Sequence, residues 1–174
     1  MKDFMGIILK RRSIRKYQSK TIEKDKIKNL LKAAMYAPSA VNKQPWHFIV
    51  IDDKALMNKV IEVHPNSKML REASHAVLIC GDEQKQHDDG YWIADCGAAT
   101  QNLLLAAEAE GLGACWIGIY PREKRMEALS AFFGLPSHVK PFALVSLGYP
   151  NETKEMPDRF DLNKVCYNQW SKPY

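Results

Sequence analysis

The chain has 174 residues, of which 46% are hydrophobic, and it carries a formal net charge of +5 at pH 7. This composition can build a hydrophobic core, so we expect one folded domain over residues 1–174 and not a disordered chain. The sequence has no apolar run close to the roughly 18 residues that cross a bilayer, and its N-terminal segment becomes basic too early for a signal peptide. We therefore predict a cytoplasmic protein without a membrane partner.

The positive charge is concentrated near the N-terminus. Residues 1–28 contain ten lysines and arginines but three acidic residues, so the rest of the chain is slightly acidic. A protein that coats nucleic acid usually spreads its basic residues over a wider face. The local excess favours one phosphorylated small molecule over nucleic acid, although basic runs are also common on ordinary solvated surfaces.

The cysteines and histidines lack the spacing of a metal site. Cys80, Cys96 and Cys115 lie within apolar segments, which is typical of small buried side chains. The five histidines are scattered, and they form no pair such as HExxH. We predict buried thiols and no bound metal.

Hydrophobic periodicity predicts a series of helices and short buried strands. The first helix covers residues 3–10, and the second begins at a Thr21 cap and ends before Pro38. Gly111 and Gly134 are placed to end two later helices. The expected strands are 47–52, 75–81, 114–119 and 141–150, and the other helices are 54–62, 90–111 and 122–134.

These elements predict helices packed around a small sheet, followed by an irregular tail. The tail contains Phe160, Tyr167 and Trp170 and shows little periodicity. Aromatic side chains in such a number are expected to pack on a surface. For so short a chain, that surface can belong to a second subunit.

The stretch "RRSIR" (11–15) has the residue types of an anion site. In an extended backbone, Arg11, Ser13 and Arg15 would point to one side. Arginine offers a permanently charged fork that suits phosphate, and serine adds a hydroxyl donor.

The stretch "PSAVNKQPW" (38–46) combines small residues with amides. Ser39 and Ala40 would let a ligand approach the backbone, while Asn42 and Gln44 can both donate and accept, as a uracil-like edge requires. The same residues are also typical of a turn at a helix end, in which side chains form local hydrogen bonds with the backbone. Further on, Gly118 in "WIGI" (116–119) would leave backbone N–H groups accessible to a flat ligand.

Several common catalytic motifs are missing from the sequence. No G-x-G-x-x-G follows a predicted strand, and neither GxxxxGK[ST] nor G-x-S-x-G occurs. This disfavours a Rossmann dehydrogenase, a P-loop enzyme and an α/β-hydrolase.

In combination, the short motifs resemble the FMN-dependent nitroreductase family, and in particular its small single-domain members. The resemblance covers essentially the whole chain. It is carried by "RRSIRKYQ", "AAMYAPSAVNKQPWHFIVI", "ASHAVLIC", the long Ala-rich helix, "LGACWIG", "LVSLGYP" and a tail with "YNQW". It implies an α+β fold with a mostly antiparallel central sheet flanked by helices, and an intertwined homodimer with one bound FMN in each of two interface sites.

The resemblance also implies the reaction. NAD(P)H would donate electrons, and a small oxidised molecule such as a nitroaromatic or a quinone would accept them in a ping-pong sequence. Because the cofactor carries the chemistry, no side chain is expected to act as a catalytic nucleophile or base. Arg15, beside the pyrimidine edge, would stabilise the negative charge of reduced flavin.

By position, the resemblance implies a set of cofactor-binding residues from both subunits. The other subunit would supply Pro38, Ser39, Ala40 and Asn42, with Gln44 near the same flavin edge and Trp46 as structural support. The backbone at Trp116, Ile117 or Gly118 would offer an N–H to flavin N5. The phosphate would be held by Arg11 and Ser13, with Arg12 nearby and Lys154 and Arg159 from the tail, while Asn66 and Lys68 fall where the family often contacts flavin.

Other readings stay open at this level. The same fold could serve an enone reductase or a dehalogenase, although the chain has no long insertion for the extra segment that dehalogenases carry. A non-catalytic flavin-binding sensor is a second class, and a basic nucleic-acid-binding protein is a third. Flavin colour that NADH or NADPH bleaches would favour the enzyme.

Overall fold

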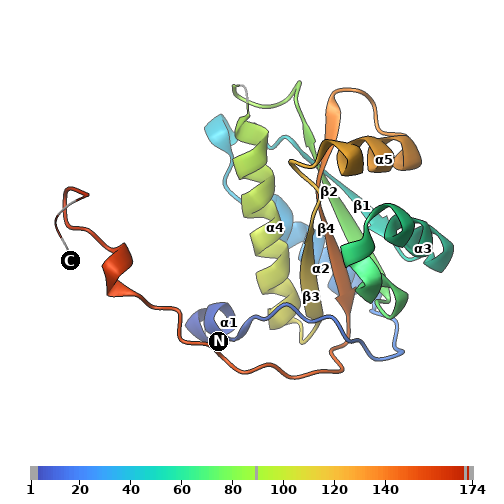
Figure 1. The fold of residues 1–174 in the computed structure, drawn as a ribbon, viewed down its shortest axis with the longest axis horizontal. Coiled ribbons are helices and arrows are strands. Elements are labelled where there is room, and N and C mark those ends of the chain that lie inside the picture. The colour runs from blue at the N-terminus through green and yellow to red at the C-terminus, as the bar shows by residue number, and fades with distance from the viewer. Residues whose placement is uncertain (1–3, 89, 171, 173–174) are drawn as a thin grey trace.

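A four-stranded antiparallel sheet forms the centre of the molecule. The computed structural model describes residues 4–88, 90–170 and 172. The strand order is β1 (Trp46–Ile51), β2 (His75–Asp82), β4 (Val139–Gly148) and β3 (Gly113–Gly118), and neighbouring strands pair antiparallel (Figure 1). The predicted α+β fold with a mostly antiparallel sheet is confirmed, as are the four predicted strands, to within two residues at each end.

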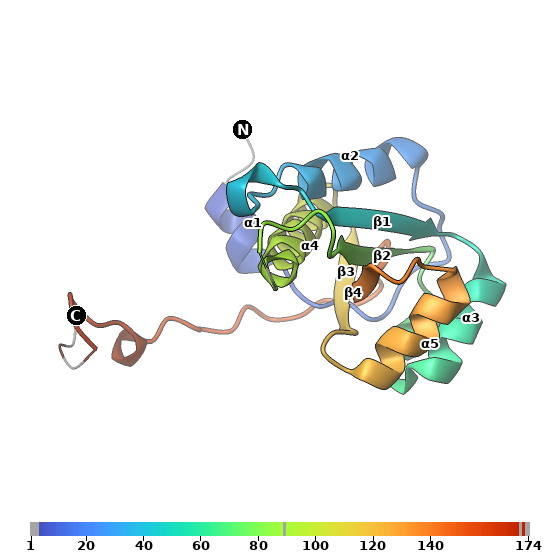
Figure 2. The ribbon, with the colours of Figure 1, turned by 90° about the horizontal axis from the view of Figure 1, so that it is seen from above.

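Helices cover both faces of this sheet (Figure 2). α2 (Lys24–Met35) and α4 (Tyr91–Ala109) lie on one face, and α3 (Lys54–Val63) and α5 (Glu123–Phe133) lie on the other. α1 (Phe4–Lys10) lies on the same side as α4. The short 3-10 segments are η1 (Ala40–Asn42), η2 (Pro65–Arg71) and η3 (Leu162–Lys164).

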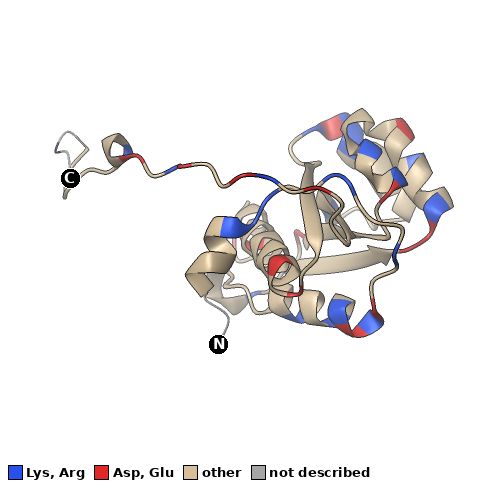
Figure 3. Cartoon of the chain, turned by 90° about the horizontal axis from the view of Figure 1, so that it is seen from below, with Lys and Arg blue, Asp and Glu red and all other residues tan. Residues whose placement is uncertain are grey.

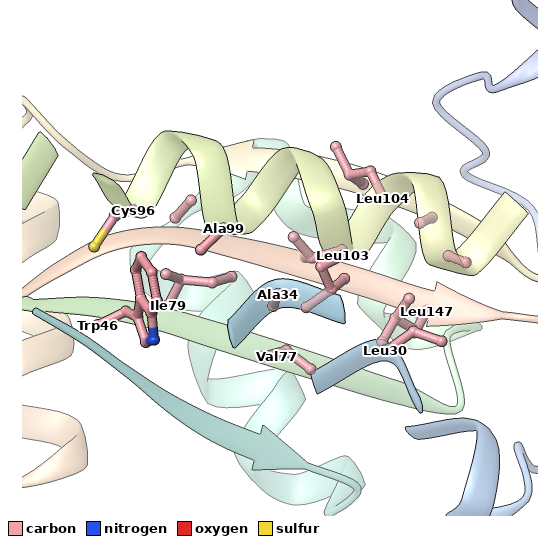
Figure 4. Close-up of a cluster of buried hydrophobic side chains, with 14 of the residues drawn as sticks. Leu30, Ala34, Trp46, Val77, Ile79, Cys96, Ala99, Leu103, Leu104 and Leu147 are labelled. Atoms are coloured by element: carbon pink, nitrogen blue, oxygen red, sulfur yellow. The ribbon is translucent and has the colours of Figure 1, made fainter. Parts of the chain in front are cut away.

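Burial of the central strands explains why their sequences are almost continuously apolar. Every residue of β2 is buried, as expected for a strand with helices on both faces. On the α2 and α4 face, Leu30 and Leu103 are fully buried beside Val77 and Trp46 (Figure 4). Trp46 therefore supports the core, as predicted, and the predicted burial of the thiols of Cys80, Cys96 and Cys115 is confirmed.

The predicted Thr21 cap is wrong. α2 begins at Lys24, its N-cap is Glu23, and no side chain caps it. Ile22 is buried in the core, so the segment stays extended for two residues beyond Thr21 before the helix starts. By contrast, Asp53 caps α3 and accepts bonds from the backbone N–H groups of Ala55 and Leu56.

The tail runs away from the body of the subunit (Figure 1). Its large apolar side chains are uncovered within one chain, with Phe160 77% and Trp170 93% exposed. Phe4 and Met5 on α1 are exposed as well. Among the described helices, none combines the length and apolar character needed to cross a bilayer.

Candidate functional site

A groove of about 1070 Å³ opens along the free edge of β3. At one end of this edge, Ser13 forms a parallel bridge with Ala114, and the N–H of Ile14 donates to the Ala114 carbonyl (3.0 Å). This extended N-terminal segment covers the beginning of β3 and leaves its second half uncovered. The groove therefore lies against the backbone of residues 116–118.

Four segments distant in sequence form the rest of the groove. They are the extended segment 15–16, η2, the turn into α5, and the start of the tail at residues 152–154. Of the sequence-predicted site residues, the groove brings together seven: Arg15, Asn66, Lys68, Trp116, Ile117, Gly118 and Lys154.

Gly118 leaves open space in the wall of the groove. A Cβ built on Gly118 would meet no protein atom within 4 Å, and its φ lies outside the left-handed region. Neither packing within the chain nor backbone conformation therefore requires glycine here. At Gly113, on the same strand, an added Cβ would lie 2.7 Å from Cγ2 of Ile14, so that glycine is needed for packing.

The backbone of Gly118 faces the free edge. The Ile119 N–H donates to the Phe142 carbonyl, in the direction of β4 (3.3 Å). Because successive residues of a strand alternate, the N–H and C=O of Gly118 point the opposite way, towards the free edge. Two side chains donate to the Gly118 carbonyl: His64 through Nε2 (2.9 Å) and Arg125 through Nη1 (3.2 Å). Sequence reasoning missed both side chains, because neither lies in a recognisable motif.

Basic residues dominate the charge of the groove. Its lining includes six lysines and arginines but two carboxylates, Glu72 and Glu152. Basic residues also mark the end of α1 and the extended segment that follows it (Figure 3). The cationic residues that line the groove are Arg15, Lys16, Lys68, Arg122, Arg125 and Lys154. The groove is therefore suited to an anionic ligand.

Glu152 orders the basic residues at one end of the groove. Its Oε1 accepts a hydrogen bond from the Arg15 N–H (2.5 Å) and pairs with Lys154 Nζ (3.4 Å). Lys154 in turn donates to the Ser13 carbonyl (2.7 Å). The hydrogen bond from the Arg15 backbone is the main cause that holds the pKa of Glu152 below its usual value.

Cys115 marks the place where the predicted anion-binding residues meet. Burial raises the pKa of its thiol, while the charges of Arg15, Lys154 and Arg11 and a hydrogen bond with Ser13 act in the opposite direction. Arg15 and Lys154 line the groove, and Lys154 donates to the Ser13 carbonyl, whereas Arg11 and Ser13 do not line the groove themselves.

Arg12 and Arg159 do not line the groove. Arg12 points to the other side of the extended segment, where its Nε donates to the Glu155 carbonyl (2.9 Å). There it lines a smaller hollow of about 220 Å³, which shares Glu152 and Lys154 with the groove. Arg159 lies in the exposed tail and does not line the groove. Within one chain, Arg12 therefore shares a hollow with Lys154, whereas Arg159 lines neither this hollow nor the groove.

The loop 38–44 also lies outside the groove of its own chain. Its bonds hold an unusual conformation, with positive φ at Val41, Asn42 and Gln44. The Ser39 hydroxyl accepts from the Gln44 N–H (2.9 Å), and Gln44 Nε2 donates to Asn42 Oδ1 (2.9 Å).

A buried carboxylate anchors the same loop. The Ala40 N–H donates to Oδ1 of Asp95, a buried residue of α4 (3.0 Å). The predicted loop residues, Pro38 included, are therefore held in place by the fold although they do not line the groove of this subunit.

Comparison with known proteins agrees with these features. A profile described as "Nitroreductase family" matches residues 8–88 and 60–149. A protein of Methanothermobacter thermautotrophicus described as "Putative NADH dehydrogenase/NAD(P)H nitroreductase" is 43% identical over 97% of this chain and 88% of its own length. A solved structure of the same description from Parabacteroides distasonis is 38% identical, with a TM-score of 0.92 over 96% of this chain and 98% of the other.

The description of a third relative names its cofactor. The structure of an FMN-dependent nitroreductase from Clostridium difficile R20291 is 32% identical to this chain. The TM-score is 0.88, and the alignment covers 95% of this chain and 99% of the other.

Proposed function

The chain belongs to the nitroreductase family, and we propose that it is an FMN-dependent oxidoreductase that transfers electrons from NAD(P)H to nitroaromatic, quinone or related acceptors. The observation that carries this proposal is the open space at Gly118 in the wall of a basic groove. A flat ring can lie against a backbone that has no side chain, and the basic residues suit its phosphate.

The residues of the groove fit FMN. Arg11, Ser13 and Lys154 would hold the phosphate, and Arg159 would join them if the tail folds back. Arg15 would lie beside the pyrimidine edge of the ring, together with Asn66 and Lys68. The ring would lie along Trp116, Ile117 and Gly118, where the edge-facing N–H of Gly118 is the donor for N5.

A second copy of the chain would complete the site. Pro38, Ser39, Ala40, Asn42 and Gln44 would reach the flavin of the partner subunit from their pre-formed loop. The exposed apolar side chains of α1 and the tail support a homodimer, since a monomer would leave them in water. Sedimentation should show a dimer, and a stable monomer that retains FMN would exclude the shared site.

The protein's part in the reaction is binding and electrostatics. When bound, FMN supplies the redox chemistry, accepting electrons from NAD(P)H and passing them to the acceptor. The fixed charge of Arg15 would favour the reduced form, because negative charge gathers at the pyrimidine edge. The N–H of Gly118 would orient the ring. No side chain is needed as a nucleophile or general base.

The simplest test is colour. Purified protein should bind FMN and turn yellow, and NADH or NADPH should bleach it in the absence of oxygen. A yellow protein that neither nucleotide bleaches would be a flavin-binding sensor instead. Colourless protein that DNA retains in a salt-dependent way would exclude both the flavin enzyme and the flavin-binding sensor. We further propose that residues 1–174 act as one domain and that the protein works in the cytoplasm.

A further inference from the structure

His64 occupies a position that the reaction described above does not use. It lies at the junction of α3 and η2, lines the groove, and is 1% exposed. Its backbone is fixed at this junction: its N–H donates to the Val60 carbonyl (2.9 Å), and its own carbonyl accepts from the hydroxyl of Ser67 (2.7 Å). The backbone of His64 is therefore fixed, and its ring Nε2 reaches the Gly118 carbonyl.

The hydrogen bond to Gly118 defines the tautomer of the neutral ring. A carbonyl oxygen can only accept, so Nε2 must carry the proton, and Nδ1 is bare in the neutral ring. Nδ1 is buried and has no hydrogen-bond partner among residues 4–88, 90–170 and 172. A buried acceptor without a partner destabilises the fold. Leucine would fill the same space without this penalty, so packing alone does not explain a histidine.

The bond restrains the glycine at the end of β3. Gly118 has no side chain to limit its dihedral angles. It pairs with Ala143 of β4, but its own N–H and C=O face the free edge, where the sheet has no further strand. Arg125 also donates to its carbonyl, but at a longer distance and from a less buried position. The shorter bond comes from the buried residue.

We propose that His64 is a positioning residue: it holds the backbone of Gly118 so that the Gly118 N–H points into the groove at flavin N5. This inference rests on the proposed function. The N–H acts on N5 differently in the two redox states, because N5 of oxidised flavin is an acceptor, whereas N5 of reduced flavin carries a proton of its own. His64 therefore stabilises bound oxidised FMN more than bound reduced FMN.

The test compares three variants. His64→Leu removes the donor at similar volume, whereas His64→Gln keeps an N–H at nearly the position of Nε2. His75→Leu is a control, because His75 is a buried histidine on β2 that does not line the groove. For each protein, the affinity for oxidised FMN and the reduction potential of the bound flavin are measured, together with the thermal unfolding of the apoprotein.

The expected result is a change in potential that follows the donor. His64→Leu should weaken binding of oxidised FMN about fivefold more than binding of reduced FMN. This raises the two-electron potential by about 20 mV, since tenfold corresponds to about 30 mV. In His64→Gln and His75→Leu, the reduction potential of bound flavin should stay near the wild-type value, even if the unfolding temperature of either variant changes.

Two outcomes would overturn the inference. If His64→Leu weakens both redox forms equally, the potential does not move, and His64 is a structural residue. If His64→Gln shifts the potential as far as His64→Leu does, the N–H donor is not the cause. Both results differ from a failure of the proposed function, in which wild-type protein itself would not bind FMN or would not be reduced by NAD(P)H.

Discussion

Replacement of Gly118 by alanine should separate stability from cofactor binding. Because an added Cβ meets no protein atom within 4 Å, the apoprotein should gain stability. Glycine within a strand is less stable than alanine by about 0.5–1 kcal/mol, which corresponds to a rise of about 1–4 °C in Tm for a chain of this size. In the FMN-bound protein, by contrast, the new methyl group would occupy the space proposed for the flavin.

The loss of FMN affinity can be estimated from what the methyl group displaces. Moving the ring away removes one neutral hydrogen bond, worth about 0.5–1.5 kcal/mol, and a part of the dispersion contacts on one side of the ring. A total of about 1–3 kcal/mol weakens binding by about five- to 150-fold. The assay is calorimetric titration of the apoprotein with FMN, together with thermal unfolding of the same sample.

Gly113→Ala on the same strand is the matched control. Its Cβ would approach Cγ2 of Ile14 to 2.7 Å, so this variant should lose stability by about 1–3 kcal/mol through overpacking. Unchanged FMN affinity in Gly118→Ala would refute the reasoning, because the open space at Gly118 would then not hold the flavin.

Three further outcomes are expected. Arg11→Ala should weaken FMN binding by about ten- to a hundredfold but riboflavin binding much less; equal losses by calorimetry would place Arg11 away from the phosphate. Arg15→Ala should lower the potential of bound flavin, with Arg15→Lys keeping part of the effect; a redox titration that matches wild type would contradict this. The pKa of Glu152 is lowered in the folded state, mainly by the hydrogen bond from the Arg15 N–H. Its contribution to stability is therefore complete above the unfolded-state pKa and is lost as the pH falls through the folded-state pKa. Glu152→Gln should consequently lose less stability than wild type between about pH 7 and about pH 3 in urea denaturation, and an equal loss would contradict the assignment.

The regular elements could be predicted because their sequences repeat with the right period. In α2, Ile27, Leu30 and Ala34 fall on one helical face, and all three are buried. The start of the same helix could not be predicted, because burial of Ile22 competes with the local preference of Thr21 for a cap. η2 was missed because it consists of two short 3-10 turns that meet at a kink at Ser67, and such short turns have no apolar period.

Without the family resemblance, local patterns in the sequence could predict the site only where neighbouring residues form it. The alternation of "RRSIR" places Arg11, Ser13 and Arg15 together, and the same alternation turns Arg12 away. The bond between His64 and Gly118 joins residues that are 54 positions apart. Only the fold shows this contact, because no local pattern links the end of α3 to the end of β3.

The most direct test of the proposed function is anaerobic reduction of the FMN-loaded protein. Adding NADH or NADPH should bleach the visible absorbance of the flavin, and a nitroaromatic or quinone added afterwards should restore it. Protein that does not retain FMN, or bound FMN that stays oxidised with both nucleotides, would contradict an NAD(P)H-dependent oxidoreductase.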